Sequence, residues 1–301
     1  MAVSIGELLS SPRVTGLAIG VFDGVHLGHR AILAHAFAGF GPGETAALTF
    51  EPHPLAVIAP EKAPPRLTTE AQREALLHAA NAGAVYTLRF DEALRQHSAE
   101  TFMAELSHLF PALQRIAFGP NWRFGRGRSG NASLLAAYGA AHGFVTDLVP
   151  AVEHEGKPVS SSRIREAIST RDFAGATAML GRGYEVVGTV VAGDGRGAGI
   201  GFPTANIGGI AQLLPPPGVY ACTAQVNGIT HRAVANYGSK PTFGPDGKPV
   251  LEAHLLDFSG NLYGATLTVG AFRFLREERK FESVAGLKAQ IAADVRSALR
   301  I

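Results

Sequence analysis

Apolar runs alternate with helix-like stretches through the first half of the chain. Short runs that are apolar almost throughout are typical of the buried strands of a parallel sheet. These runs are residues 16–22, 45–50, 83–88, 115–119 and 144–149. The stretches between them that favour helices are residues 28–37, 69–81, 98–109 and 131–142. The alternation predicts a Rossmann-like α/β domain with a parallel sheet, in which ligands bind at the carboxyl ends of the strands.

The hydrophobic pattern changes near Gly181-Arg182-Gly183. Two helical stretches, residues 162–168 and 171–180, precede this point, and period-two alternation between turns rich in glycine and proline follows it. The predicted strands of this second half are residues 184–191, 218–226, 229–236, 250–258 and 265–274. The pattern is antiparallel and favours a small β-barrel. We therefore expect two domains, at residues 1–183 and 184–301.

A final amphipathic helix is predicted at residues 283–299. Apolar side chains recur there at three- and four-residue spacing, as expected for one buried face of a helix. They are Val284, Leu287, Ile291, Val295 and Leu299. We expect this helix to close the antiparallel barrel domain.

Composition agrees with two folded domains. The chain has 301 residues, 46% of them hydrophobic and 17% charged, whereas a typical domain has about 100–200 residues. Disorder is excluded because there is enough apolar material for real cores. The formal net charge is only +2, so bulk charge points neither to nucleic acid nor to a membrane surface. The isoelectric point of about 8.8 is compatible with small anionic ligands.

The single cysteine and the amino-terminal residues bear on the compartment. Cys222 lies in the apolar run 219–223 and has no partner for an internal disulfide, so we interpret it as a packing residue. Residues 1–11 contain Glu7 and lack the basic-then-apolar pattern of a signal peptide. No stretch reaches the roughly 20 apolar residues of a membrane span. We expect a cytoplasmic protein.

Two histidines follow the first predicted strand. Residues 20–29 join that strand to a helix and end in His26-Leu27-Gly28-His29. Free N–H groups at a helix start attract phosphate, Gly28 lets it approach the backbone, and two imidazoles can donate hydrogen bonds to a leaving pyrophosphate. A chance pair of histidines and a metal pair are the alternatives, but the glycines favour phosphate and no third metal ligand has a recognisable spacing.

A second candidate anion site is the Ser160-Ser161-Ser162-Arg163-Ile164-Arg165 segment. Its serines can cap the following helix, and Arg165, one turn in, can add charge-assisted bonds to phosphate. A plain N-cap with a solvated arginine explains the same residues, and the segment alone does not decide between the two interpretations.

The segment 125–130 is a literal G-x-G-x-x-G that follows a strand-like run and precedes a helix, with Asp147 downstream. A dinucleotide fingerprint requires the first glycine directly at the strand end. Residues 120–124 intervene here. We therefore reject a nicotinamide site and interpret the segment as a basic loop over a phosphate or flavin substrate.

The second half has its own candidate phosphate segment. Residues 193–201 contain five glycines in nine residues, followed by Phe202-Pro203-Thr204-Ala205-Asn206. A flexible backbone of this kind can wrap phosphates. Thr204 and Asn206, two residues apart, can point the same way and hold Mg²⁺ through oxygen. The alternative is an ordinary turn.

A carboxylate lies inside the predicted strand 250–258. With period two, Glu252 shares a face with Val250, His254 and Leu256. A glutamate on a mostly apolar face can serve as the general base that takes the proton of an attacking alcohol. A solvated carboxylate at a sheet edge remains the alternative.

Ordered matches along both halves resemble one family. They comprise residues 20–29, 50–54, 121–130 and 160–165 in the first half, and 201–206, 218–220, 236–243 and 251–258 in the second. With these segments the chain is similar to the bacterial bifunctional riboflavin kinase/FMN adenylyltransferases, also called FAD synthetases. The resemblance implies an α/β nucleotidyltransferase domain that joins FMN to the AMP part of ATP, giving FAD and pyrophosphate. It also implies a riboflavin kinase barrel that phosphorylates the ribityl 5′-hydroxyl with Mg·ATP.

The resemblance assigns residues to both reactions. The adenylyltransferase ATP site would comprise Gly20, Phe22, Asp23, His26, Gly28, His29, Asn121, Ser162 and Arg165. The kinase ATP site would comprise Gly193, Gly195, Gly201, Pro203, Thr204 and Asn206. Thr204 and Asn206 would also hold Mg²⁺, and Glu252 would be the catalytic base. The implied partners are riboflavin, FMN and ATP, without nucleic acid or membrane, and the oligomeric state stays open.

Some positions depart from the family pattern. Tyr237 stands where an aliphatic residue is common, and Trp122 and Arg123 occupy a variable part of the flavin loop. We expect altered flavin affinity at most. Two alternative functions are an adenylyltransferase fused to an unrelated barrel, and a catalytically inactive flavin-binding regulatory module. The Pro-Thr-Ala-Asn segment and Glu252 argue against the first, and intact His26, His29 and Glu252 argue against the second.

Overall fold

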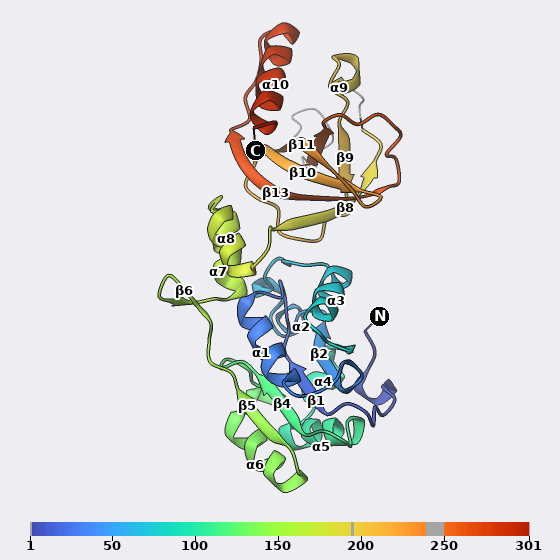
Figure 1. Ribbon diagram of the computed structural model, residues 1–301, viewed down its shortest axis with the longest axis vertical. Helices are drawn as coiled ribbons and strands as arrows, with labels where there is room; N and C mark the ends of the chain where they lie inside the picture. Colours follow the sequence, from blue (N-terminus) through green and yellow to red (C-terminus); the bar gives the residue numbers. More distant parts are fainter. Residues whose placement is uncertain (1, 194–195, 239–249, 301) are drawn as a thin grey trace. The chain divides into compact units, whose positions relative to one another are not determined.

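The computed structural model describes residues 2–193, 196–238 and 250–300 (Figure 1). The chain forms two compact units, Met1–Ser161 and Ser162–Ile301. The helices between residues 162 and 180 therefore fold with the second unit, although the pattern of the sequence had placed them in the first domain. The boundary expected between residues 183 and 184, as the division between the two activities, stays a prediction.

The first unit contains the predicted parallel sheet. Its strands lie in the order β3-β2-β1-β4-β5, and every neighbouring pair is parallel. The strands are β1 (Gly16–Ile19), β2 (Thr45–Glu51), β3 (Ala84–Arg89), β4 (Arg115–Phe118) and β5 (Val145–Leu148). Each of the five strands expected from the apolar runs is present.

Helices cover both faces of this sheet (Figure 1). The predicted helices are α1 (Leu27–Phe37), α3 (Glu70–Ala79), α5 (Ala99–Leu109) and α6 (Ala132–His142). Elements that were not predicted are α2 (Pro54–Ile58), α4 (Glu92–Gln96), the hairpin β6 (Glu153–His154) and β7 (Lys157–Pro158), and the 3₁₀ turns η1 (Ile5–Glu7), η2 (Pro42–Glu44), η3 (Pro60–Lys62) and η4 (Arg126–Arg128). All are too short to show a hydrophobic period.

The two faces of the sheet differ in side-chain size. Large residues of β1, β2 and β4 pack on α5 and α6, whereas fully buried Ala18, Ala47 and Ala117 face α1 and α3. Small side chains at these three positions let α1 lie close to the strands. Because β1 neighbours both β2 and β4, the chain leaves the sheet in opposite directions there, which is where open α/β sheets bind ligands.

The second unit contains the predicted antiparallel barrel. Its described strands close in the order β10-β11-β12-β9-β8-β13. They are β8 (Glu185–Val191), β9 (Ala205–Gly208), β10 (Gly218–Val226), β11 (Ile229–Gly238), β12 (Val250–Leu255) and β13 (Thr266–Arg276). The unpredicted strand, β9, has four residues and is formed through its pairing with β8 and β12.

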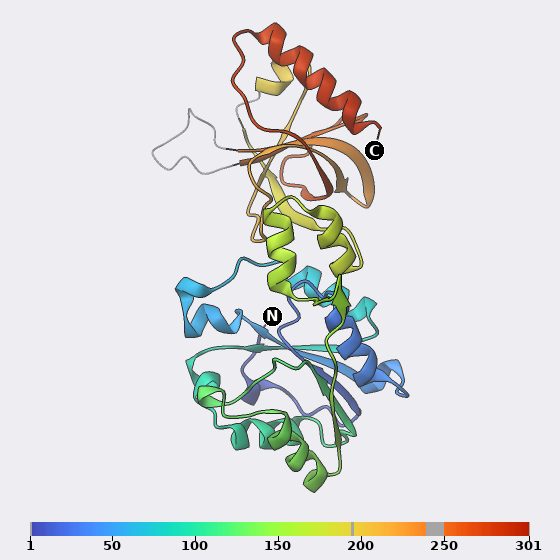
Figure 2. The same cartoon turned by 90° about the vertical axis from the view of Figure 1, so that its left-hand side faces the viewer.

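Helices of the second unit are α7 (Ser161–Ser169), α8 (Phe173–Leu180), α9 (Arg196–Gly199) and α10 (Val284–Ala298). The closing helix α10 packs on β10 and β11 through Val295 and Ala298 (Figure 2). The predicted apolar stripe is wrong at its ends, because Val284 and Leu299 are exposed. An ion pair between Arg276 and buried Asp294, 2.8 Å long, anchors the helix instead.

Candidate active sites

The loop between β1 and α1 has a strained backbone. Phe22 and Val25 have φ values of +52° and +38°, which are rare for residues other than glycine. Such conformations cost about 1–3 kcal/mol each and persist only where the surroundings enforce them. Both side chains are fully buried, which supplies that constraint. Stored strain of this kind is characteristic of binding loops.

Asp23 fastens the same loop to residues 67 and 68. Its carboxylate accepts hydrogen bonds from the backbone N–H groups of Leu67 at 3.0 Å and Thr68 at 3.1 Å, and from the Thr68 hydroxyl at 3.2 Å. The Gly24 N–H donates in turn to Thr68 Oγ1 at 3.2 Å. Sequence analysis placed Asp23 among the ATP-binding residues, and these contacts also give it a role in shaping the loop.

A partly buried ion network supports the loop from the side of β2. Glu51, at the end of β2, pairs with Arg66 and, at 3.0 Å, with Arg73 of α3. Arg73 Nη1 and the Thr49 hydroxyl both donate to the Val21 carbonyl, at 3.5 and 3.0 Å. Sequence reasoning did not single out either arginine. The signal available was Arg73 itself, a charged residue on the buried face of an amphipathic helix.

His26 caps α1, and its ring is stacked on that of His29. The backbone N–H of His29 donates to His26 Nδ1 at 3.2 Å, so the proton of neutral His26 is on Nε2. The two ring centroids are 3.6 Å apart, with 16° between the planes. A Cβ at Gly28 would lie 3.1 Å from the His26 ring. Gly28 therefore makes room for the imidazole, in addition to any close approach of phosphate.

His29 is a neutral imidazole at physiological pH. Burial, and then the neighbouring His26, hold the pKa of His29 well below its usual range. Its Nδ1 is buried and has no hydrogen-bond partner among the described residues. An unpaired buried polar atom is costly unless a ligand completes it. The binding of a phosphate group by His29 stays a prediction.

Asn121 lies in the segment that follows β4, the sheet neighbour of β1. The residue is exposed, while Trp122 beside it stacks on Phe124 with ring centroids 4.6 Å apart. Both the histidine loop and Asn121 therefore follow the carboxyl ends of adjacent strands. Two glycines of the rejected fingerprint have steric reasons, since a Cβ at Gly125 would lie 2.7 Å from the Ala99 backbone nitrogen and one at Gly130 would lie 2.5 Å from the Phe124 ring.

The serine segment divides between the two compact units. Ser161, in the first unit, donates its hydroxyl to the Asp23 carbonyl at 2.9 Å and begins α7. Ser162, which is exposed, and Arg165, which is half-buried, belong to the second unit. Their assignment to the adenylyltransferase site stays a prediction.

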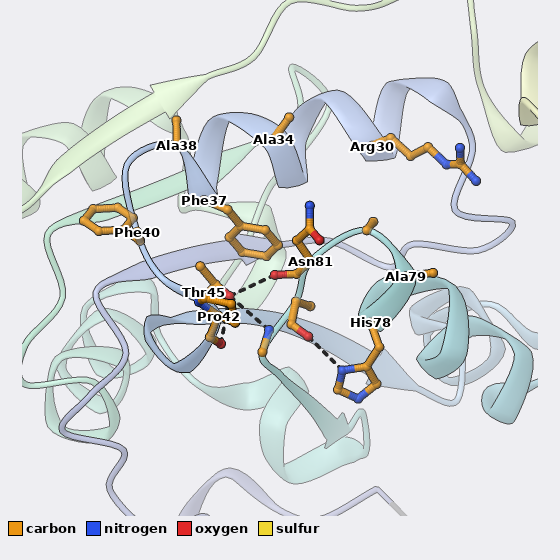
Figure 3. Close-up of a pocket in the computed structure, with 13 residues that line it drawn as sticks. Arg30, Ala34, Phe37, Ala38, Phe40, Pro42, Thr45, His78, Ala79 and Asn81 are labelled. Carbon is orange, nitrogen blue, oxygen red and sulfur yellow. Dashed lines mark hydrogen bonds between the residues drawn. The ribbon is translucent and has the colours of Figure 1, made fainter.

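Figure 3 shows a pocket of the first unit. It lies at the amino-terminal ends of β2 and β3, whereas the histidine loop follows the carboxyl end of β1. Its volume is about 660 Å³, and it is lined by the later turns of α1, the start of β2 and the connection from α3 to β3. Thr45 bridges this lining by donating to the Asn81 carbonyl at 2.9 Å and accepting from Gly83 N–H at 3.0 Å. None of the predicted site residues lines it.

In the barrel, register places Glu252 between two asparagines. Glu252 of β12 is directly opposite Asn206 of β9 on one side and Asn236 of β11 on the other. Side chains of directly opposed residues share a face, with Cβ atoms about 4.5–5.5 Å apart. The buried residues of β12 are Leu251, Ala253 and Leu255, so Glu252 lies on the other face with Val250 and His254. The predicted face is thus confirmed for Val250 and His254. It is wrong for Leu256, which lies beyond the end of β12 and is buried in a hydrophobic cluster.

The glycine-rich segment lies against the row of Asn206, Glu252 and Asn236, which we call the polar row. A Cβ at Gly193 would lie 2.0 Å from Asn206 Nδ2, so a larger residue there would have to displace the Asn206 amide. Gly201 has a φ of +87° with open space around it. Thr204 is exposed directly before β9, and the Pro203 carbonyl is 2.7 Å from His254 Nδ1. Gly195 lies outside the described residues, as do positions 239–243 of the matching segment 236–243.

Comparison with known proteins assigns both units. A FAD synthetase family model matches residues 9–163, and a riboflavin kinase model matches residues 180–301. Proteins named bifunctional riboflavin kinase/FMN adenylyltransferase are 38% identical in Pseudomonas fluorescens, over 93% of this chain and 90% of the relative. The Bacillus subtilis protein of this name is 33% identical, over 94% of this chain and 91% of the relative. The Escherichia coli K12 protein of the same name is 38% identical over 92% and 90%.

A solved structure from Streptococcus pneumoniae, described as a macrolide-efflux protein, superposes with a TM-score of 0.86. It is 27% identical and covers 100% of this chain and 99% of its own. Within residues 2–193, 196–238 and 250–300, no helix combines the length and apolar character needed to cross a membrane.

The fold and the matches define a two-domain enzyme that combines a nucleotidyltransferase with a small-molecule kinase. The chain belongs to the bifunctional riboflavin kinase/FMN adenylyltransferase family. Its substrates are riboflavin, FMN and ATP, and its products include FMN and FAD. Nothing in these findings favours the inactive flavin-binding module as an alternative.

Proposed function

We propose that two separate sets of residues carry out the two reactions. One set lies along facing strand positions of the barrel, and the other lies at the carboxyl edge of the parallel sheet. In the barrel, Glu252 takes the proton of the ribityl 5′-hydroxyl as that oxygen attacks the γ-phosphorus of ATP, and the bond from this phosphorus to the β–γ bridging oxygen breaks to release ADP. In the α/β unit, His26 and His29 bind the phosphates of a second ATP while a phosphate oxygen of FMN attacks its α-phosphorus. The observation that carries the kinase proposal is the register of Asn206, Glu252 and Asn236 across three strands.

The kinase step depends mainly on positioning and charge, because phosphoryl transfer needs little covalent help from the protein. A carboxylate held on a strand keeps a fixed direction, which suits a base that must reach one hydroxyl. The flanking amides supply neutral donors and acceptors without adding charge beside the phosphates. The position of Gly193 lies against the Asn206 amide, so the glycine-rich segment borders the same row at this residue.

The proposal includes Mg²⁺ in the kinase site, and the chemistry of the available donor atoms fits this ion. Thr204 and Asn206 provide two neutral oxygens, and the described residues contain no group of three His, Cys, Asp or Glu that could hold a metal ion. So sparse a set suits a hard cation that arrives with ATP and keeps waters and phosphate oxygens as ligands. When bound, the ion would neutralise charge on the phosphates.

The adenylyl-transfer step needs no covalent enzyme intermediate. The bond between the α-phosphorus and the bridging oxygen breaks as the new pyrophosphate linkage of FAD forms, so negative charge grows on the departing pyrophosphate. Donors fixed at the start of α1 stabilise that charge, because they need no reorganisation. Neutral His29 serves as such a donor while avoiding the cost of burying an imidazolium.

The direct test is turnover. Purified protein would be incubated with riboflavin, ATP and Mg²⁺, and the flavins separated by chromatography. FMN that appears first and is followed by FAD supports the proposal. Riboflavin that binds without change would contradict it and favour the regulatory module.

We also infer that the enzyme works in the cytoplasm. Both reactions consume ATP, and Cys222 is a buried thiol whose pKa is raised by burial to about 12. Such a thiol makes no use of an oxidising compartment. Fractionation of cells that produce the protein, followed by immunodetection, would test this.

A further inference from the structure

A second carboxylate reaches the polar row of the barrel from outside the strands. Glu278 lies in the segment between β13 and α10, and its Oε1 accepts a hydrogen bond from Asn236 Nδ2 at 2.9 Å. It also lies directly on the backbone of Gly238. A Cβ at Gly238 would be 1.8 Å from Glu278 Oε2 and 2.2 Å from Oε1. The carboxylate thus fills the space that any other residue at 238 would occupy.

The register brings this contact beside the proposed base. Asn236 and Gly238 are two residues apart on β11, so they share one face. Asn236 is directly opposite Glu252 on β12. Three polar groups therefore lie side by side on this face: Glu252, Asn236 and the Glu278 carboxylate. The amide of Asn236 lies between the two acids.

The backbone on both sides of Glu278 is anchored. Arg276 pairs with buried Asp294 of α10 at 2.8 Å, and Glu277 pairs with Arg171 at 2.6 Å. Arg279 donates to Gln290 of α10. Contacts of the two residues before Glu278 and of the one after it limit where its carboxylate can lie, so its contact with Asn236 is preorganised rather than incidental.

The hydrogen bond restricts the Asn236 amide. The amide is planar, so a donor directed to Glu278 fixes the direction of Oδ1 and of the second N–H as well. An amide beside a general base can hold either the base or the attacking hydroxyl in place. Loss of such placement costs rate because small displacements of reacting groups are expensive.

We propose that Glu278 is a positioning residue of the kinase reaction, which accepts a hydrogen bond from Asn236 and thereby orients that amide beside Glu252. This proposal rests on the proposed function of the barrel. It assigns Glu278 no contact with substrate, and it adds a residue that lies outside the glycine-rich segment and outside the strand of the base.

The test compares Glu278→Ala with Glu278→Gln in the full-length enzyme. Glutamine keeps the acceptor oxygen and loses the charge. We expect kcat for riboflavin phosphorylation, measured as the sum of FMN and FAD, to fall roughly ten- to a hundredfold in Glu278→Ala with a much smaller change in KM. Glu278→Gln should stay within about threefold of the parent. Glu282→Ala, which removes an exposed glutamate of the same segment, is the matched control.

A second variant attacks the contact from β11. Gly238 does not have a left-handed φ, so alanine fits the backbone and its Cβ displaces the Glu278 carboxylate. Gly238→Ala should reproduce the kcat loss of Glu278→Ala. The double variant Gly238→Ala/Glu278→Ala should be no slower than either single variant, because both remove the same contact.

Three results would overturn the proposal: an unchanged kcat in Glu278→Ala, an equal loss in Glu278→Gln, or additive losses in the double variant. FAD formation from supplied FMN should not change, because that reaction belongs to the first unit. Far-UV circular dichroism and thermal unfolding check that the barrel of each variant is folded. Glu252→Ala separates the two levels. If it abolishes phosphorylation while Glu278→Ala has no effect, only the positioning role fails. If Glu252→Ala keeps full kinase activity, the proposed function of the row fails.

Discussion

The two candidate sites are built by different means. The histidine loop is held by buried side chains, strained φ angles and the hydrogen bonds of Asp23, so its geometry exists before any ligand binds. The barrel site takes its geometry from strand register, while Thr204 and Gly201 beside it are exposed. The histidine loop is thus preorganised by the packing of side chains, whereas the barrel site is preorganised by the pairing of strands. Substitutions should therefore damage them in different ways.

The largest effect expected is on the kinase. Glu252→Ala removes the proposed base and should lower riboflavin phosphorylation by about 10²–10⁴-fold, while FAD still forms from supplied FMN. Chromatography of flavins from each substrate checks both statements. Robust turnover of riboflavin in this variant would falsify the assignment of Glu252.

The reciprocal substitution is His29→Ala. It removes the neutral donor at the start of α1 and should lower FAD formation by about 10²–10³-fold, because a preorganised donor to the leaving group is lost. Phosphorylation of riboflavin should continue, so FMN should accumulate in the same assay. Near-normal FAD synthesis would show that the histidine loop is not the adenylyl-transfer site.

A pair of glycine substitutions tests how the barrel site is held. Gly193→Ala drives a Cβ into the Asn206 amide and should reduce kinase kcat/KM by roughly tenfold or more. Gly201→Ala meets no neighbour and should cost only the strain of a positive φ, about 1–2 kcal/mol in that segment. Steady-state kinetics that rank the two variants in reverse would contradict the fit at Gly193.

A smaller effect is expected when the loop is loosened from within. Asp23→Ala leaves the N–H groups of Leu67 and Thr68 without their acceptor and should reduce the stability of the first unit by about 1–3 kcal/mol. Asp23→Asn keeps one acceptor oxygen and is the matched control. Urea denaturation followed by fluorescence of Trp122 reports on this unit. Equal stabilities for the two variants would argue against a stabilising role for the hydrogen bonds from Leu67 and Thr68 to Asp23, which we call the clasp of Asp23.

The smallest effect concerns Cys222. Because burial raises the pKa of its thiol to about 12, only about one molecule in ten thousand is thiolate at pH 8. Iodoacetamide should leave the folded protein unmodified for hours and alkylate it promptly in guanidinium. Mass spectrometry measures the difference. Rapid modification without denaturant would mean that the strand around Cys222 opens readily.

The apolar runs and capping residues predicted most of the elements. Helix α3 begins at the Thr69 N-cap, which accepts from Gln72 N–H at 3.1 Å, and this local signal is legible in the sequence. Strand β9 was missed because four residues after a proline have no period of their own. The exposed ends of α10 were missed because an apolar stripe does not show how much of it the barrel can cover.

Local chemistry and periodicity, which depend on residues near each other along the chain, were sufficient to establish the two folds and to select His26, His29, Asn206 and Glu252. The contacts that orient these groups join residues far apart in the chain. The Glu51–Arg73 pair, the clasp of Asp23 on Leu67 and Thr68, and the placement of Glu278 on Asn236 are of this kind. No pattern along the chain encodes such contacts, because strand register and the packing of distant segments are decided only when the whole unit folds.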